Sequence, residues 1–242
     1  MTLRARHVLG PFHRARGLFV SNVFIVDGRA GDRWLVDTGH AVERAALLIG
    51  LRRSGFRPRD LSGVLLTHRH SDHAGNAAFL RRVYGLRIFA HRADAEVLEG
   101  RTAPPPLRPV TGDPIAWAFA QIENRTRVRV PIDRALDDGD AVGSLEVHQV
   151  PGHTEGSVLY RHAGTRTFLS GDALLAAVPP LTITQRMCLP HPDFALDLAQ
   201  ALASLRSFHA RDLPYDNLLA GHGDPILGDA KRRAEELLEG GG

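Results

Sequence analysis

Four side chains that bind metal ions well lie within six consecutive residues of this 242-residue chain: His68, His70, Asp72 and His73. Side chains two residues apart in an extended segment point the same way, so His68 and His70 can bind one metal together. Asp72 and His73 are neighbours that point differently and can serve a second metal nearby. Imidazole and carboxylate ligands suit zinc, and also iron, manganese or nickel. A histidine-rich surface loop is the alternative, but the cluster directly follows an apolar stretch, which favours a metal site.

Three more candidate ligands follow apolar runs later in the chain. His153, Asp172 and His222 each stand beside glycine, in the segments PGH, SGD and GHG. Glycine lets the backbone turn sharply and approach closely. Each of these residues alone is more typical of an ordinary turn. Their recurrence after apolar runs predicts four strand ends that meet along one edge of two packed sheets.

Apolar periodicity predicts the strands and helices that would position these side chains. The expected strands are 18–26, 34–36, 63–66, 86–90, 144–150, 157–161, 167–169 and 217–220, and the expected helices are 42–53, 75–84, 115–122, 194–208 and 229–238. The proline-rich stretch 103–114 cannot form a regular element. We therefore expect one domain over residues 1–242, with a Pro-rich insertion around 103–125. This insertion is either a substrate-contacting segment or a plain surface loop.

The composition narrows the class of protein. Hydrophobic residues make up 43% and charged residues 24%, as in ordinary soluble proteins. No apolar run approaches the roughly 20 residues that cross a bilayer, and residues 1–10 lack the apolar centre of a signal peptide. We therefore expect a cytoplasmic protein without a membrane partner. Cys188 is the only cysteine, which excludes an intramolecular disulfide and a cysteine-rich zinc site. The net charge of +3 comes from scattered arginines, which gives little support to a nucleic-acid partner.

Taken together, the motifs resemble those of the metallo-β-lactamase superfamily, in which HxHxDH is followed by isolated His, Asp and His. Here THRHSDH is followed in order by PGHTEGS, FLSGDALL and LAGHGDPI. Asp37, in LVDTG, is similar to the early aspartate that lies under the metal site in this family; a strand-end cap is its alternative role. The resemblance covers essentially the whole chain. It implies an α/β fold, a four-layer αββα sandwich with the site at the sheet edge.

The resemblance also implies a ligand set and a reaction. The first metal would be bound by His68, His70 and His153, and the second by Asp72, His73 and His222, with Asp172 bridging both. The expected cofactors are two divalent ions, zinc first, with iron or manganese as alternatives. A metal-bridging hydroxide would attack an ester, thioester, lactone, amide or phosphodiester of a small-molecule substrate. Asp72 would also be catalytic, because it can orient the nucleophile.

Details of the motifs favour some branches over others. Asp172 makes the chain more similar to glyoxalase II-like enzymes than to antibiotic-hydrolysing β-lactamases. Only residues 223–242 follow His222, so we expect no helical glutathione-binding domain. Leu175 stands where acyl-homoserine lactonases commonly carry tyrosine. The alternatives are a mononuclear iron oxidoreductase of the persulfide dioxygenase kind, a nuclease and a non-catalytic scaffold. The substrate and the oligomeric state stay open, a homodimer being one alternative.

Overall fold

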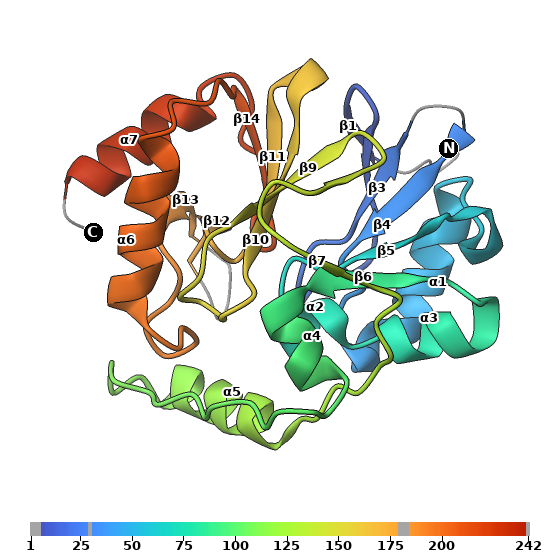
Figure 1. Ribbon diagram of the computed structural model, residues 1–242, viewed down its shortest axis with the longest axis horizontal. Helices are drawn as coiled ribbons and strands as arrows, with labels where there is room; N and C mark the ends of the chain where they lie inside the picture. Colours follow the sequence, from blue (N-terminus) through green and yellow to red (C-terminus); the bar gives the residue numbers. More distant parts are fainter. Residues whose placement is uncertain (1–5, 29–30, 179–183, 241–242) are drawn as a thin grey trace.

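The computed structural model describes residues 6–28, 31–178 and 184–240, in which two β-sheets face each other (Figure 1). One sheet contains, in spatial order, β1 (Arg6–Leu9), β2 (Phe12–Arg14), β3 (Phe24–Asp27), β4 (Arg33–Val36), β5 (Gly63–Leu65), β6 (Ile88–His91) and β7 (Arg134–Leu136). The other contains β14 (Asn217–Ala220), β11 (Thr167–Gly171), β10 (Val158–His162), β9 (Leu145–Gln149) and β8 (Ala141–Val142). A separate antiparallel pair consists of β12 (Leu175–Ala177) and β13 (Gln185–Cys188).

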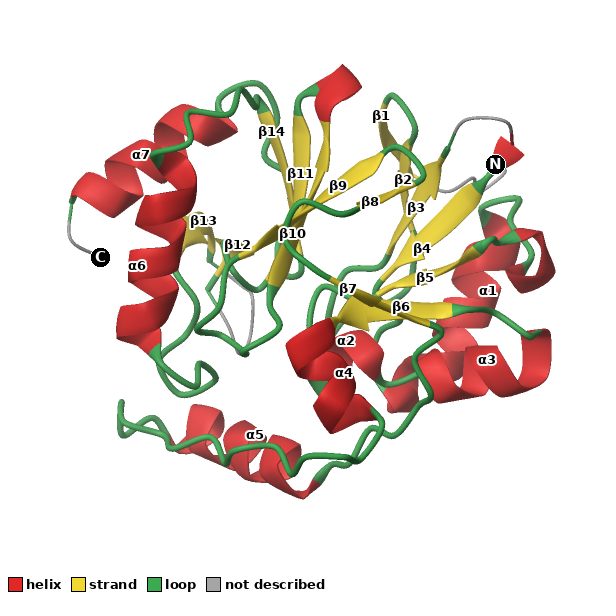
Figure 2. Ribbon diagram, in the orientation of Figure 1, coloured by secondary structure: helices red, strands yellow, loops and turns green. Residues whose placement is uncertain are grey.

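Helices cover the outer faces of both large sheets (Figure 2). The first sheet is covered by α1 (Arg44–Arg53), α3 (Ala77–Tyr84) and α4 (Arg92–Leu98), and the second by α6 (Leu198–His209) and α7 (Ala230–Glu239). The single turn α2 (Ser71–Ala74) follows β5. In Figure 2, α5 (Pro114–Arg125) runs along the lower edge of the molecule, outside these layers. The predicted four-layer αββα sandwich is therefore confirmed.

Three apolar cores hold the four layers together, and strand alternation decides which side chain enters which core. In β5, Val64 packs with α1 and α3, whereas Leu65 packs between the two sheets. In β10, Tyr160 lies between the sheets, and Leu159 packs toward α6 and α7. Successive strand side chains point to opposite faces, so a strand that is buried on both faces is an unbroken apolar run. Burying one such side chain contributes roughly 1.5–3 kcal/mol.

The predicted strand over residues 18–26 is wrong in its first part, because β3 covers only its end. The backbone N–H of Phe19 donates to the Glu43 carboxylate at 2.6 Å, and the N–H of Asn22 donates to the Gly221 carbonyl at 2.7 Å. These partners lie outside the sheet, so the residues before β3 form a loop. The loop therefore lies against the segment that carries the last candidate ligand.

The proline-rich segment behaves as expected, since it contains no helix or strand between residues 103 and 113. The helix that follows is longer than the predicted 115–122. Asp113 accepts a hydrogen bond from the Ile115 N–H at 2.8 Å, and Pro114 occupies the first turn. A capping aspartate followed by proline stabilises a helix start.

The sequence predicts no signal peptide in residues 1–10. Residues 1–5 of that segment lie outside the described residues. Within the described ranges, none of the helices combines the length and the apolar character needed to cross a membrane.

Candidate metal centre

The loops that follow β5, β9, β11 and β14 meet at one place in the molecule. They bring together all seven ligands predicted from the sequence: His68, His70, Asp72, His73, His153, Asp172 and His222. Their possible ligand atoms form overlapping groups within which these atoms lie no more than 4.8 Å apart. Each loop begins at the end of a strand, so the sheets position the side chains.

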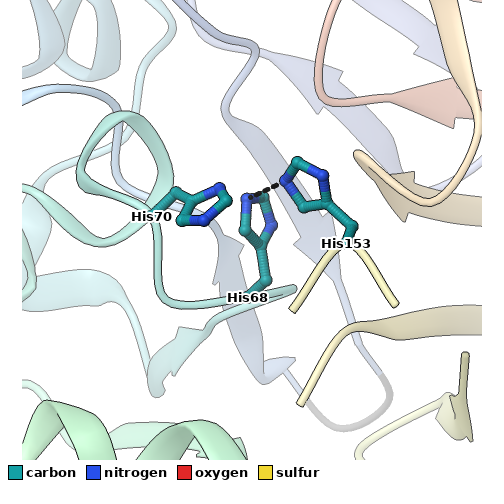
Figure 3. Close-up of side chains that lie close together, drawn as sticks. All are labelled: His68, His70 and His153. Carbon is teal, nitrogen blue, oxygen red and sulfur yellow. Dashed lines mark hydrogen bonds between the residues drawn. The ribbon is translucent and has the colours of Figure 1, made fainter. Parts of the chain in front are cut away.

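One group consists of three histidines whose rings converge. Figure 3 shows His68 and His70 facing His153 from the opposite loop. The Nε2 atoms of His68 and His153 are 3.1 Å apart. Donor atoms around a tetrahedral zinc ion, each at about 2.05 Å, lie about 3.3 Å from one another. The spacing of these nitrogens therefore fits a metal ion between them.

The second group joins two histidines to two carboxylates. Oδ2 of Asp72 lies 3.4 Å from Nε2 of His73 and 3.3 Å from Nε2 of His222. Asp172 places Oδ1 3.2 Å from His73, and Oδ2 3.3 Å from His222 and 3.7 Å from His153. Asp172 thus lies between the two groups, where a bridging ligand would be. Oδ1 of Asp172 and Nε2 of His73 are buried without a hydrogen bond, which a shared cation would compensate.

Hydrogen bonds behind the candidate ligands select the tautomers of two histidines. Nδ1 of His73 lies 2.8 Å from Oδ2 of Asp37, and the Thr67 hydroxyl donates to the same oxygen at 2.8 Å. Nδ1 of His68 lies 3.1 Å from that hydroxyl. Because the hydroxyl proton is directed at Asp37, Nδ1 of His68 donates to the hydroxyl oxygen. Both rings therefore present an unprotonated Nε2 to a metal ion when they are neutral.

Asp37 combines the two roles considered for it. It stands at the end of β4 with a left-handed φ of 61°, which is uncommon for a residue other than glycine. Its Oδ1 accepts the Thr67 N–H at 2.8 Å, and its Oδ2 contacts His73. It therefore holds both the start of the segment that carries the candidate ligands and the ring of His73.

The two groups differ in how many of their side chains carry a charge. Burial lowers the pKa of His153 to about 4 and the pKa values of the other two rings in its group well below their usual range, so this group is neutral at pH 7. Burial acts in the same direction on His222, but Asp172 and Asp72 outweigh it and raise its pKa to about 10. The carboxylates likewise raise the pKa of His73. A divalent cation at the second group would replace these protons.

The sequence did not predict two carboxylates that contact the ligand-bearing segment, one of them buried (Asp94) and one half-buried (Glu123). Asp94 in α4 accepts a hydrogen bond from the Arg69 N–H at 2.8 Å. Glu123 in α5 accepts one from the Ser71 N–H at 3.2 Å and another from the Ser71 hydroxyl at 2.5 Å. Neither residue belongs to a metal-binding motif. The one signal available is that Glu123 lies in the segment considered for substrate contact.

The fold, the order of the motifs and a family profile agree. The sequence matches the family described as the Metallo-beta-lactamase superfamily over residues 16–222. The chain belongs to this superfamily, whose members are metal-dependent hydrolases.

The relatives include named hydrolases. The chain is 31% identical over 159 residues to "Probable metallo-hydrolase YybB" of Bacillus subtilis (strain 168), covering 64% of this chain and 61% of that protein. It is 30% identical over 155 residues to a hydroxyacylglutathione hydrolase of Fuscovulum blasticum, covering 62% and 46%. Among solved structures, the metallo-beta-lactamase family protein TTHA1429 from Thermus thermophilus matches with a TM-score of 0.68 and 27% identity, covering 96% of this chain and 79% of that one. The matches with the first two relatives thus cover less than two thirds of their length.

Proposed function

We propose that the protein is a binuclear metal-dependent hydrolase acting on a small-molecule ester, thioester, lactone or phosphodiester. The observation that carries the proposal is the pair of adjacent ligand groups with Asp172 between them. The names of two relatives, a probable metallo-hydrolase and a hydroxyacylglutathione hydrolase, support hydrolysis. Among the candidate substrates, thioesters are the first to test because of the second relative.

The donor set suits the proposed ions. The first ion would be held by His68, His70 and His153, the second by Asp72, His73 and His222, and both by Asp172. Imidazole with carboxylate fits zinc first, and iron or manganese next. Two such ions, when bound, supply a hydroxide nucleophile near neutral pH and stabilise negative charge on the oxygen under attack.

Asp72 is the residue that we assign to catalysis beside metal binding. Its side chain is 23% exposed, more than the 11% of Asp172, so it is the more accessible of the two carboxylates. Burial raises its pKa, but His73 and His222 outweigh burial and hold the pKa well below the usual range. The group therefore stays ionised and can accept a hydrogen bond from the attacking water, which orients that water.

The test combines metal quantification with a panel of thioesters, lactones, phosphodiesters and β-lactams on one preparation. We expect two zinc-like ions per chain and hydrolysis of at least one substrate. His68→Ala combined with His70→Ala should abolish binding at the three-histidine group and turnover. The matched control is His7→Ala with His13→Ala, a neighbouring histidine pair on β1 and β2.

Two results would contradict the proposal. Full hydrolytic activity in the metal-free double variant would exclude a metal-dependent reaction. A single iron per chain together with oxygen consumption would instead support the persulfide dioxygenase-like alternative.

The remaining expectations from the sequence stay predictions. They are the single domain over residues 1–242 with its insertion around 103–125, the cytoplasmic location, and the absence of nucleic-acid and membrane partners. Binding to RNA or DNA with a steep salt dependence would contradict the third.

A further inference from the structure

The ligand-bearing segment is held at every second residue by a carboxylate from a different part of the chain. Each of three backbone N–H groups donates to one of them: Thr67 to Asp37, Arg69 to Asp94, and Ser71 to Glu123. Thr67 and Arg69 lie in the loop after β5, and Ser71 is the first residue of α2. The positions between these anchors carry His68 and His70, and Asp72 directly follows the last anchor.

Asp94 differs from the other two carboxylates because it also binds the loop that carries His153. Its Oδ2 accepts the Thr154 hydroxyl at 2.8 Å, and its Oδ1 accepts the Gly156 N–H at 3.1 Å. The approach is close: a Cβ at Gly156 would lie 2.6 Å from Cγ of Asp94. One side chain, fully buried in α4, therefore joins the two segments that supply the three-histidine group.

The charge of Asp94 is balanced locally. The Arg69 side chain is 5% exposed, with its Nε 3.7 Å from Oδ1 of Asp94 and its Nη2 3.2 Å from Glu155. A buried carboxylate is costly unless it is paired and hydrogen-bonded. Asp94 meets both conditions, with partners on both ligand-bearing segments. Without the charge of Asp94, the Arg69 guanidinium would keep only one ion-pair partner, the half-exposed Glu155. Arg69 lies between His68 and His70 in the sequence.

We infer that Asp94 is a positioning residue of the three-histidine metal site, because it couples the segment of His68 and His70 to the loop of His153. This inference rests on the proposed metal binding. Groups behind metal ligands that hold them in place typically change metal affinity 10- to 100-fold when they are mutated. Without Asp94 the two segments lose their common anchor, and the three rings lose their mutual spacing.

The test is Asp94→Asn, which keeps the shape but removes the charge and one acceptor oxygen. The metal-free protein is titrated with Co²⁺ at pH 7.5, followed by visible absorption and by competition with a chelator. Burial raises the pKa of Asp94 to about 6, so the group is ionised at this pH. We expect the affinity for one of the two ions to fall about 10- to 100-fold.

Thr154→Val is a second, milder variant that keeps the carboxylate and removes one of its donors. It should weaken the same ion, and its effect should not add to that of Asp94→Asn, because both act on one hydrogen-bonded network. Thr154→Val also keeps the inference testable if Asp94→Asn does not fold.

The matched control is Asp193→Asn. Asp193 is equally buried and accepts hydrogen bonds from the Val110 N–H and from the Thr111 N–H and hydroxyl, not from a ligand-bearing segment. It should leave both Co²⁺ affinities unchanged.

The outcomes separate this inference from the proposed function. A wild-type chain that binds no Co²⁺ overturns both. A wild-type chain that binds two ions, with the same affinities in folded Asp94→Asn, overturns the inference alone. Lower thermal stability of Asp94→Asn with unchanged affinities would show a purely structural role and also overturn the inference.

Discussion

Asp37→Asn should impair metal binding by changing the tautomer of a ligand. The carboxylate accepts three hydrogen bonds of 2.8 Å each, from the Thr67 N–H, the Thr67 hydroxyl and Nδ1 of His73. Asparagine has a single acceptor oxygen. If that oxygen keeps the Thr67 N–H, the amide group faces Nδ1 of His73, which must then accept. The ring proton moves to Nε2, the atom that faces the metal site.

The size of the effect follows from the groups involved. A hydrogen bond to a charged group contributes about 1.5–3 kcal/mol. Loss of a partner behind a metal-ligating histidine lowers metal affinity about 10- to 100-fold. Asparagine tolerates left-handed backbone, so the φ of 61° at position 37 should persist and the fold with it. The loss should therefore appear in metal affinity and turnover, and not in secondary structure.

Zn²⁺ competition titrations of the metal-free variant would measure the affinity, and long-range ¹H–¹⁵N NMR of the imidazoles would report the tautomer of His73. We expect weaker binding at the second group and a His73 ring whose Nδ1 carries no proton. Wild-type affinity combined with a protonated Nδ1 in Asp37→Asn would refute the reasoning. Asp193→Asn again serves as the matched control, because its carboxylate is buried and holds no ligand.

Three further predictions concern the same centre. A Cβ at Gly221 would collide with Oδ1 of Asp172 and lie 2.6 Å from Cε1 of His73, so Gly221→Ala should weaken the second ion at least ~10-fold in a Zn²⁺ titration. Gly164→Ala, whose Cβ meets nothing closer than 3.3 Å, should not. Burial raises the pKa of Glu123 from 4.5 to about 6. Between these pH values the folded chain therefore binds more protons than the unfolded chain. The free energy of unfolding should fall by about 2 kcal/mol as the pH rises through this range. Urea unfolding of metal-free Glu123→Gln should lack this fall, and an equal slope in both proteins would contradict it. Free Zn²⁺ at 100 times its Kd should raise the free energy of unfolding by about 2.7 kcal/mol, and an unchanged Tm in the wild type would count against the site.

Much of the fold follows from local patterns in the sequence. Strands such as β5 and β14 are short apolar runs that end in polar tips, and the amphipathic helix α7 ends near glycine. These signals are local because burial on one or both faces leaves a period in the sequence. The strands β1, β2 and β8 and the pair β12–β13 carry no such period. These strands form because a neighbouring strand pairs with them, and a short stretch of sequence does not show that pairing.

The loop before β3 is the opposite case, in which local composition predicts a strand that the structure does not contain. Residues 18–23 have strand-like composition, yet their N–H groups bind Glu43 and Gly221. Tertiary partners outweighed the local preference, as they often do for short apolar segments. As a result, the Ser21 hydroxyl in this loop donates to the carbonyl of Asp72, a candidate ligand, at 2.5 Å.

The sequence by itself determined which side chains converge, because each candidate ligand stands in a short motif at the end of an apolar run, and strand ends of packed sheets meet at one edge. Only the tertiary structure decided how those side chains are held. The ring proton of His73 depends on Asp37, and the spacing of the three-histidine group depends on Asp94. These partners lie 25 to 62 residues from the groups they bind. A hydrogen bond over that separation leaves no period or motif in the chain. A carboxylate in a helix looks the same in sequence whether it faces solvent or the segments beside candidate metal ligands.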